Sequence, residues 1–109
     1  MNGGELLDDS ENTTRDVFLL TKPPKSDRAK ICLRLAALSK NAILYLAGDG
    51  VYNLLGDAIE ALPSARIFAC KEDLEARGVQ PGRIAETHCD FYDILVEEMM
   101  LDGNRIYTF

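Results

Sequence analysis

Three short runs of consecutive apolar residues stand out along the chain: DVFLLT at 16–21, AILYLA at 42–47 and ARIFAC at 65–70. A strand that is apolar on consecutive positions is typical of a parallel sheet covered on both faces. Each run is separated from the next by a loop and a helix-type segment. The pattern therefore predicts three strands of a mainly parallel sheet.

A helix is predicted between the first two strands. Ser26 or Asp27 can cap its start, and Ile31, Leu35 and Leu38 lie on one apolar stripe along it. This stripe is the one we expect to face the core.

Two further helices flank the third strand. Leu54, Ala58 and Leu62 recur every four residues, which predicts an amphipathic helix that stops at Pro63. KEDLEARG follows the strand as a short helix, and Gly78 occupies the position of a left-handed cap at its end.

The last third of the chain gives a weaker pattern. Residues 83–88 form a fourth strand interrupted by charges, Phe91, Leu95 and Met99 align on a helix, and RIYTF at 105–109 is a possible fifth strand. The alternation predicts a three-layer α/β/α fold, with a mainly parallel sheet of about five strands and helices on both faces.

Composition and charge divide the chain into two parts. Residues 1–15 contain four acids and little apolar material, so we expect a flexible acidic tail before a single domain at 16–109. The formal net charge of −6 argues against direct, tight binding of nucleic acid, because phosphate contacts need clustered Lys and Arg. The N-terminus resembles no signal peptide and no run is long enough to cross a membrane, so the expected location is the cytoplasm.

The three cysteines have no CxxC spacing, and the chain has one histidine. This count predicts neither a disulfide framework nor a metal site, and it favours free thiols in a reducing compartment. Cys32 lies on or beside a helix stripe and is expected to pack in the core. Cys89 follows His88, but neighbouring side chains on a strand point to opposite faces, so the pair is not expected to act together.

Cys70 stands where the third strand gives way to a helix. Ligands gather at the carboxyl ends of parallel strands, and free amides with the helix dipole stabilise a thiolate there. Lys71 adds a positive charge, whereas Glu72 and Asp73 oppose the thiolate. On position alone, a buried core cysteine is the more common case. Two interpretations stay open: a reactive thiol and a packing residue.

GDGVYN at 48–53 follows the second strand. It lacks both the GxGxxG spacing of a dinucleotide site and the lysine of a P-loop. We expect a turn at Gly50 that brings Asp49, Tyr52 and Asn53 to the carboxyl edge of the sheet, where they could wall a site.

Three stretches carry a family resemblance: LYLAGDGVYN, IFACKEDLEARGV and NRIYTF. With these, residues 16–109 resemble the DsrE/DsrF/DsrH family, which includes the TusB, TusC and TusD proteins of bacterial sulfur relay. EDLEARG is typical of the DsrH/TusB branch. Cys70 and Gly78 keep the interval of the persulfide-carrying cysteine in the DsrE and TusD branches, at a position where TusB-like chains generally have none.

The resemblance implies a sulfurtransferase-like carrier without a cofactor. Cys70 would take sulfane sulfur as a persulfide and pass it to a cysteine of a partner protein, with residues 49–53 shaping the approach and Lys71 assisting. Such a role needs an exposed Cys70 that is alkylated faster than Cys32 and Cys89. Homo- or hetero-oligomers are expected.

Two alternatives remain. One is a non-catalytic TusB/DsrH-like subunit that serves assembly, and the other is a small-molecule or nucleotide-binding domain, which fold analogy alone supports. The sulfur donor, the acceptor and the pathway stay open, since tRNA thiolation and dissimilatory sulfur metabolism both use this family.

Overall fold

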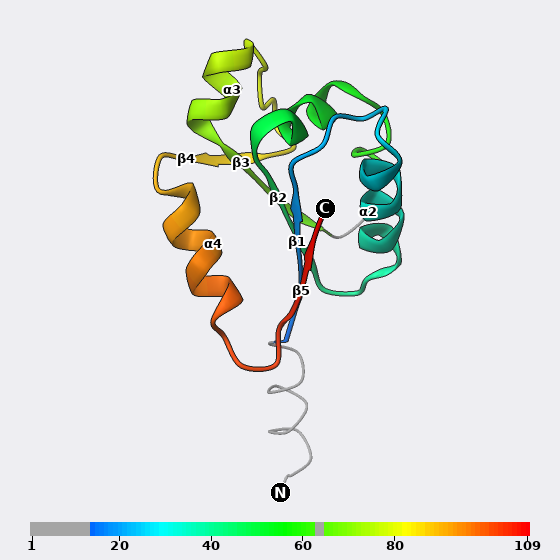
Figure 1. Ribbon diagram of the computed structural model, residues 1–109, viewed down its shortest axis with the longest axis vertical. Helices are drawn as coiled ribbons and strands as arrows, with labels where there is room; N and C mark the ends of the chain where they lie inside the picture. Colours follow the sequence, from blue (N-terminus) through cyan, green and yellow to red (C-terminus); the bar gives the residue numbers. More distant parts are fainter. Residues whose placement is uncertain (1–13, 63–64) are drawn as a thin grey trace, which may run out of the picture.

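Five parallel strands form a sheet at the centre of the computed structural model, which describes residues 14–62 and 65–109 (Figure 1). Their order across the sheet is β4-β3-β2-β1-β5. The strands are β1 (Asp16–Leu20), β2 (Ala42–Leu46), β3 (Arg66–Cys70), β4 (Glu86–His88) and β5 (Arg105–Thr108). The predicted parallel sheet of five strands is confirmed.

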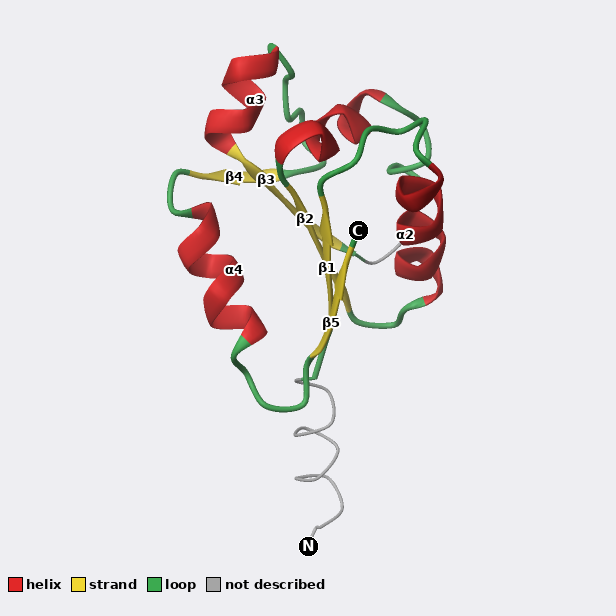
Figure 2. Ribbon diagram, viewed as in Figure 1, coloured by secondary structure: helices red, strands yellow, loops and turns green. Residues whose placement is uncertain are grey.

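Helices cover both faces of this sheet, as predicted (Figures 1 and 2). One face packs against α2 (Asp27–Leu38) and the 3₁₀ helix η1 (Gly48–Leu55), and the other packs against α4 (Phe91–Met99). The short helix α3 (Lys71–Arg77) continues directly from β3 at the carboxyl edge. The three-layer α/β/α arrangement is therefore confirmed.

Alternation along the strands divides the core into two clusters. Leu44, Leu46 and Ala69 face α2, whereas Tyr45, Phe68 and Cys70 face α4. All five residues of β2 are buried because strands flank it on both sides and helices cover both faces.

The caps of α2 and α3 follow the sequence pattern. The Ser26 side chain accepts a hydrogen bond from the amide of Arg28, and Gly78 ends α3 with φ of 67°. This φ lies in the left-handed region that glycine tolerates best. Both predicted helix boundaries are confirmed.

The prediction that the apolar stripe of α2 faces the core is wrong. Ala29, Cys32, Leu33 and Ala36 are the buried residues of α2, whereas the stripe of Ile31, Leu35 and Leu38 lies on the exposed side. Small side chains let α2 approach the sheet closely, and the larger ones are left outside.

The predicted helix over 54–62 is also wrong. Gly56 adopts an extended conformation, with φ −106° and ψ 167°, and ends η1. Beyond it the chain forms turns with backbone hydrogen bonds between residues three apart. Ile59 and Leu62 still reach the core from these turns, so the apolar spacing reflects burial without an α-helix.

Arg15, the last residue of the predicted tail, contacts the end of the folded domain. Arg15 pairs with Glu98 of α4 at 3.2 Å, and its amide donates to Asn104 Oδ1 at 3.0 Å. Arg15 therefore belongs to the folded domain instead of the predicted tail. Residues 1–13 lie outside the described part of the chain. No helix among the described residues is long and apolar enough to cross a bilayer.

Candidate functional site

Cys70 is the last residue of β3 and the N-cap of α3, as the sequence predicts. Its side chain points to the α4 side, into the core cluster that includes Tyr45, Phe68, Phe91 and Leu95. Only 3% of its surface is exposed. The sequence left the exposure of this thiol open, and in the structure α4 and the aromatic side chains cover it.

Opposing effects act on the acidity of Cys70. Burial, the largest of them, raises the pKa of the thiol, because a thiolate loses solvation there. The backbone amides of Asp73 and Glu72 lower the pKa, as the start of a helix should, while the Asp73 carboxylate raises it. The net shift is upward, which holds the residue as a neutral thiol at neutral pH.

Asp73 is fixed by contacts from two directions. Its Oδ2 accepts a hydrogen bond from the Gly48 amide at 2.7 Å, and its Oδ1 lies 3.5 Å from Arg77 Nη1. Arg77 Nε also donates to Asp49 Oδ1 at 3.0 Å. These contacts join the start of η1 to α3, so the carboxylate beside Cys70 cannot easily turn away.

Arg77 is a residue that the sequence analysis missed. The hydrogen bond and charge of Asp49 raise the pKa of its guanidinium, and its Cζ lies 6.0 Å from the ring centre of Tyr52. The spacing of Asp73 and Arg77, four residues apart within KEDLEARG, was a signal for this pair.

The predicted loop residues divide into two groups. Asp49 and Tyr52 lie beside Arg77 at the carboxyl edge. Asn53 is buried and its Nδ2 donates to the carbonyls of Lys22 and Gly50, each at 2.9 Å. Asn53 therefore braces the loop.

Gly50 also has a structural role. Its backbone approaches the end of β1 so closely that a Cβ atom would collide with the carbonyl of Leu20. Glycine is required here by this contact, and the sequence GDG therefore needs no bound phosphate to explain it.

Lys71 is exposed at the first position of α3. It forms no salt bridge with another residue of 14–62 or 65–109. Together with Leu74, Gly78 and Thr87 it lines a hollow of about 450 Å³ between α3 and β4. Cys70 does not line this hollow, so the hollow gives no access to its thiol.

Tyr92, which the sequence analysis did not single out, lies close to the thiol. Burial is the largest cause that raises its pKa, and the charges of Asp73, Cys70 and Glu72 raise it further. The side chain is half exposed on α4, and its ring meets that of Phe91 edge to face at 5.0 Å. The sequence signal for this proximity was that Tyr92 is the second residue of a helix that begins at the carboxyl edge of the sheet, where Cys70 also lies.

The other two cysteines differ sharply. Cys32 is fully buried, and desolvation raises its pKa to about 12, which confirms the predicted packing role. Cys89 is exposed. Because β3 pairs with β4 so that Cys70 lies opposite His88, Cys89 follows at the same edge of the sheet. The expected structural role for Cys89 is therefore wrong, and it is the accessible thiol among the three.

His88 does not act as a base for Cys89 in this arrangement. Its ring stacks on Phe68 with centres 5.3 Å apart, and its nitrogens lie 3.7 Å from Glu86 and 3.9 Å from Asp90. Within the described residues, no group of three or more His, Cys, Asp or Glu side chains is arranged to hold a metal ion.

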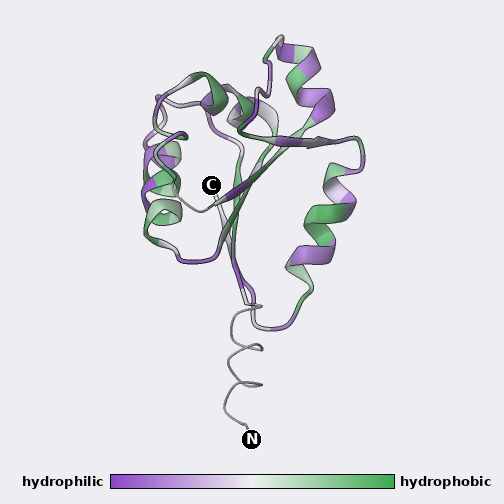
Figure 3. Ribbon diagram, turned by 180° about the vertical axis from the view of Figure 1, so that it is seen from behind, coloured by the Kyte–Doolittle hydropathy of each residue, from purple (hydrophilic) through white to green (hydrophobic). Residues whose placement is uncertain are grey.

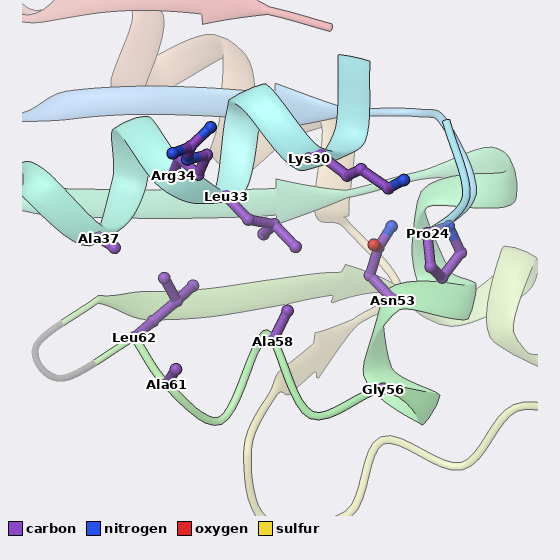
Figure 4. A pocket seen from close by; sticks show the side chains of 10 residues that line it. All are labelled: Pro24, Lys30, Leu33, Arg34, Ala37, Asn53, Gly56, Ala58, Ala61 and Leu62. Atoms are coloured by element: carbon purple, nitrogen blue, oxygen red, sulfur yellow. The ribbon is translucent and has the colours of Figure 1, made fainter. Parts of the chain in front are cut away.

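A separate apolar pocket of about 430 Å³ lies between α2 and the turns that follow η1 (Figure 4). Leu33 and Ala37 line it from α2, and Ala58, Ala61 and Leu62 line it from the turns. It belongs to the α2 side of the sheet, whereas Cys70 faces α4. The pocket is therefore not part of a site around the thiol.

Comparison with known proteins gives one match. A family model described as "DsrH like protein" matches residues 22–101, which includes β2, β3 and the Cys70 edge. No curated protein and no solved structure matches the chain. The chain therefore belongs to the DsrH-like family, within the DsrEFH sulfur-relay group.

Proposed function

We propose that the chain is a non-catalytic assembly subunit of a sulfur-relay complex. The observation that carries the proposal is the burial of Cys70, which is 3% exposed and has a raised pKa. Sulfur transfer between proteins needs a thiolate that a second cysteine can reach. A neutral thiol in the core meets neither condition. The proposed setting is the cytoplasm, where thiols stay reduced.

The exposed sides of α2 and α4 support an assembly role. Ile31, Leu35 and Leu38 are exposed on α2, and Val96 and Met100 are exposed on or next to α4. Exposed apolar side chains grouped along a helix are typical of protein contacts. DsrH-like proteins act within sulfur-relay complexes, so the proposed partners are DsrE-like and DsrF-like subunits.

A second candidate is a persulfide carrier on Cys70, favoured by the backbone amides of Glu72 and Asp73 that lower its pKa. In that reaction the Cys70 thiolate attacks the outer sulfur of a partner persulfide. A new S–S bond forms on Cys70, and the partner cysteine leaves as a thiolate. Asp49, Tyr52 and Lys71 would then flank the approach. The step requires the edge beside Tyr92 to open.

Cys70→Ser separates the two candidates. The variant is assembled with DsrE-like and DsrF-like subunits, and the flow of radiolabelled sulfur from a persulfide donor to the final acceptor is measured beside co-elution of the subunits. We expect co-elution to persist and the flow to stay within about twofold of the unmodified chain. A loss of more than about tenfold with intact co-elution would favour the carrier. Cys89→Ser serves as the matched control.

A further inference from the structure

The apolar pocket of about 430 Å³ between α2 and the turns that follow η1 has the size of a small-molecule site (Figure 4). Such sites usually have volumes of about 300–1,000 Å³. One flank of α2 lines the pocket through four residues: Lys30, Leu33, Arg34 and Ala37. The exposed stripe of α2 that is proposed for subunit contacts does not line it. The pocket, called the α2 pocket, is therefore a separate surface.

The α2 pocket has a polar end and an apolar end. Lys30 and Asn53 lie at the end near Pro24, whereas Ala61 and Leu62 lie at the other end (Figure 4). Seen from behind, α2 likewise carries hydrophilic residues beside hydrophobic ones (Figure 3). A molecule that fills the pocket should therefore be apolar along most of its length and polar at one end.

The side-chain amide of Asn53 provides a hydrogen-bond acceptor at the polar end. Asn53 is 3% exposed, and its Nδ2 donates to the carbonyls of Lys22 and Gly50. Because both carbonyls need this nitrogen, the amide cannot turn round, and Oδ1 stays on the side of the pocket (Figure 4). No residue in the described part of the chain donates to Oδ1. A bound molecule with an O–H group at this end would satisfy it.

The charges around the α2 pocket favour an anion. Lys30 and Arg34 line it, and neither forms a salt bridge with any residue of the ranges 14–62 and 65–109. The acidic residues of α2 and of the turns do not line the pocket; they are Asp27, Asp57 and Glu60. A carboxylate at the polar end would therefore meet two cations and no lining acid.

We propose that the α2 pocket binds a medium-chain hydroxycarboxylate. Its alkyl chain packs between Leu33 and Leu62. Its carboxylate pairs with Lys30 and Arg34, and its hydroxyl donates to Asn53 Oδ1. A peptide or a nucleotide fits less well, because the apolar walls would leave several of its polar groups without partners. This inference goes beyond the assembly function and does not depend on it.

Calorimetric titration of the full chain with 3-hydroxydecanoate tests the proposal. We expect a dissociation constant of about 10 µM to 1 mM. Decanoate lacks the hydroxyl and should bind about two- to tenfold more weakly, since Asn53 Oδ1 then has no donor. Decylammonium has the same chain and the opposite charge, and it should bind at least about tenfold more weakly.

Ala61→Phe tests the apolar end. Ala61 is exposed at its rim, so the fold should persist, which circular dichroism checks, while the ring occupies the space of the alkyl chain. We expect the affinity for 3-hydroxydecanoate to fall at least about tenfold. Ala76→Phe is the matched control, because Ala76 is exposed on α3 outside the pocket, and it should bind like the unmodified chain.

A double variant, Lys30→Gln with Arg34→Gln, tests the charged end. Both residues are exposed, and their loss should weaken binding of 3-hydroxydecanoate at least about fivefold while binding of decylammonium does not weaken. Lys40→Gln with Lys71→Gln removes the same total charge from exposed positions outside the pocket. This control should keep the affinity of the unmodified chain.

Four results would overturn the proposal. They are no binding of 3-hydroxydecanoate up to several millimolar, equal binding of decylammonium, equal binding of decanoate, and undiminished binding by the Ala61→Phe chain. The first three come from the unmodified chain, so they decide the matter even if a variant fails to fold. None of these results tests the assembly function, which co-elution of the subunits measures.

Discussion

Cys89 is expected to be the first of the three cysteines alkylated by iodoacetamide, with Cys32 and Cys70 far behind. Cys89 is exposed and the other two are buried. Cys32 has a pKa of about 12, so at pH 8 only about one part in 10⁴ is thiolate, about 10³-fold less than in a free cysteine. Burial slows it further by limiting access.

Peptide mapping after timed alkylation of the folded chain measures these rates. Asp73→Asn provides a control, because the Asp73 carboxylate raises the pKa of Cys70 and the amide keeps an acceptor for Gly48. The variant should react faster at Cys70 and unchanged at Cys32. Equal rates at Cys70 and Cys89 in the unmodified chain would show that the thiol is reached in solution and would favour the carrier.

Phe91→Ala is expected to lower the free energy of unfolding by about 3–5 kcal/mol. Phe91 is 1% exposed, and its ring meets that of Tyr45 edge to face at 5.5 Å. Only Phe91 and Leu95 are buried among the residues of α4, so removal of the ring leaves a cavity and loosens the helix that covers Cys70. Urea unfolding at low protein concentration measures the loss.

Val96→Ala is the matched control for this loss. Val96 is on the same helix but half exposed, so its truncation should change the free energy of unfolding by less than about 0.5 kcal/mol. Similar losses for both variants would mean that α4 does not pack through Phe91. Faster alkylation of Cys70 in Phe91→Ala would agree with α4 as its cover.

The strands were predictable because burial on both faces leaves consecutive apolar residues, as in β2. The side of α2 that faces the core was not predictable from the sequence pattern. Two sets of residues on that helix have helical spacing, and size decided between them, since Ala29, Cys32 and Ala36 fit against the sheet. The spacing of Leu54, Ala58 and Leu62 suggested a helix that does not form, because the backbone is extended at Gly56.

The position of Cys70 was predictable from the sequence, whereas its burial was not. A cysteine between strand and helix indicates the N-cap at the carboxyl edge, and Cys70 lies there. Its cover comes from Phe91 and Leu95, some twenty residues later in the chain, and local sequence does not show how that helix packs. The placement of Cys89 at the same edge likewise depends on the pairing of β3 with β4.

Mass spectrometry after treatment with a persulfide donor tests the central claim most directly. In a Cys89→Ser background, which removes the exposed thiol, we expect the intact folded chain to gain no sulfur at Cys70, and to gain it only after unfolding. Addition of one sulfur atom to Cys70 in the folded chain, absent from Cys70→Ser in the same background, would contradict the assembly-subunit account and establish the carrier.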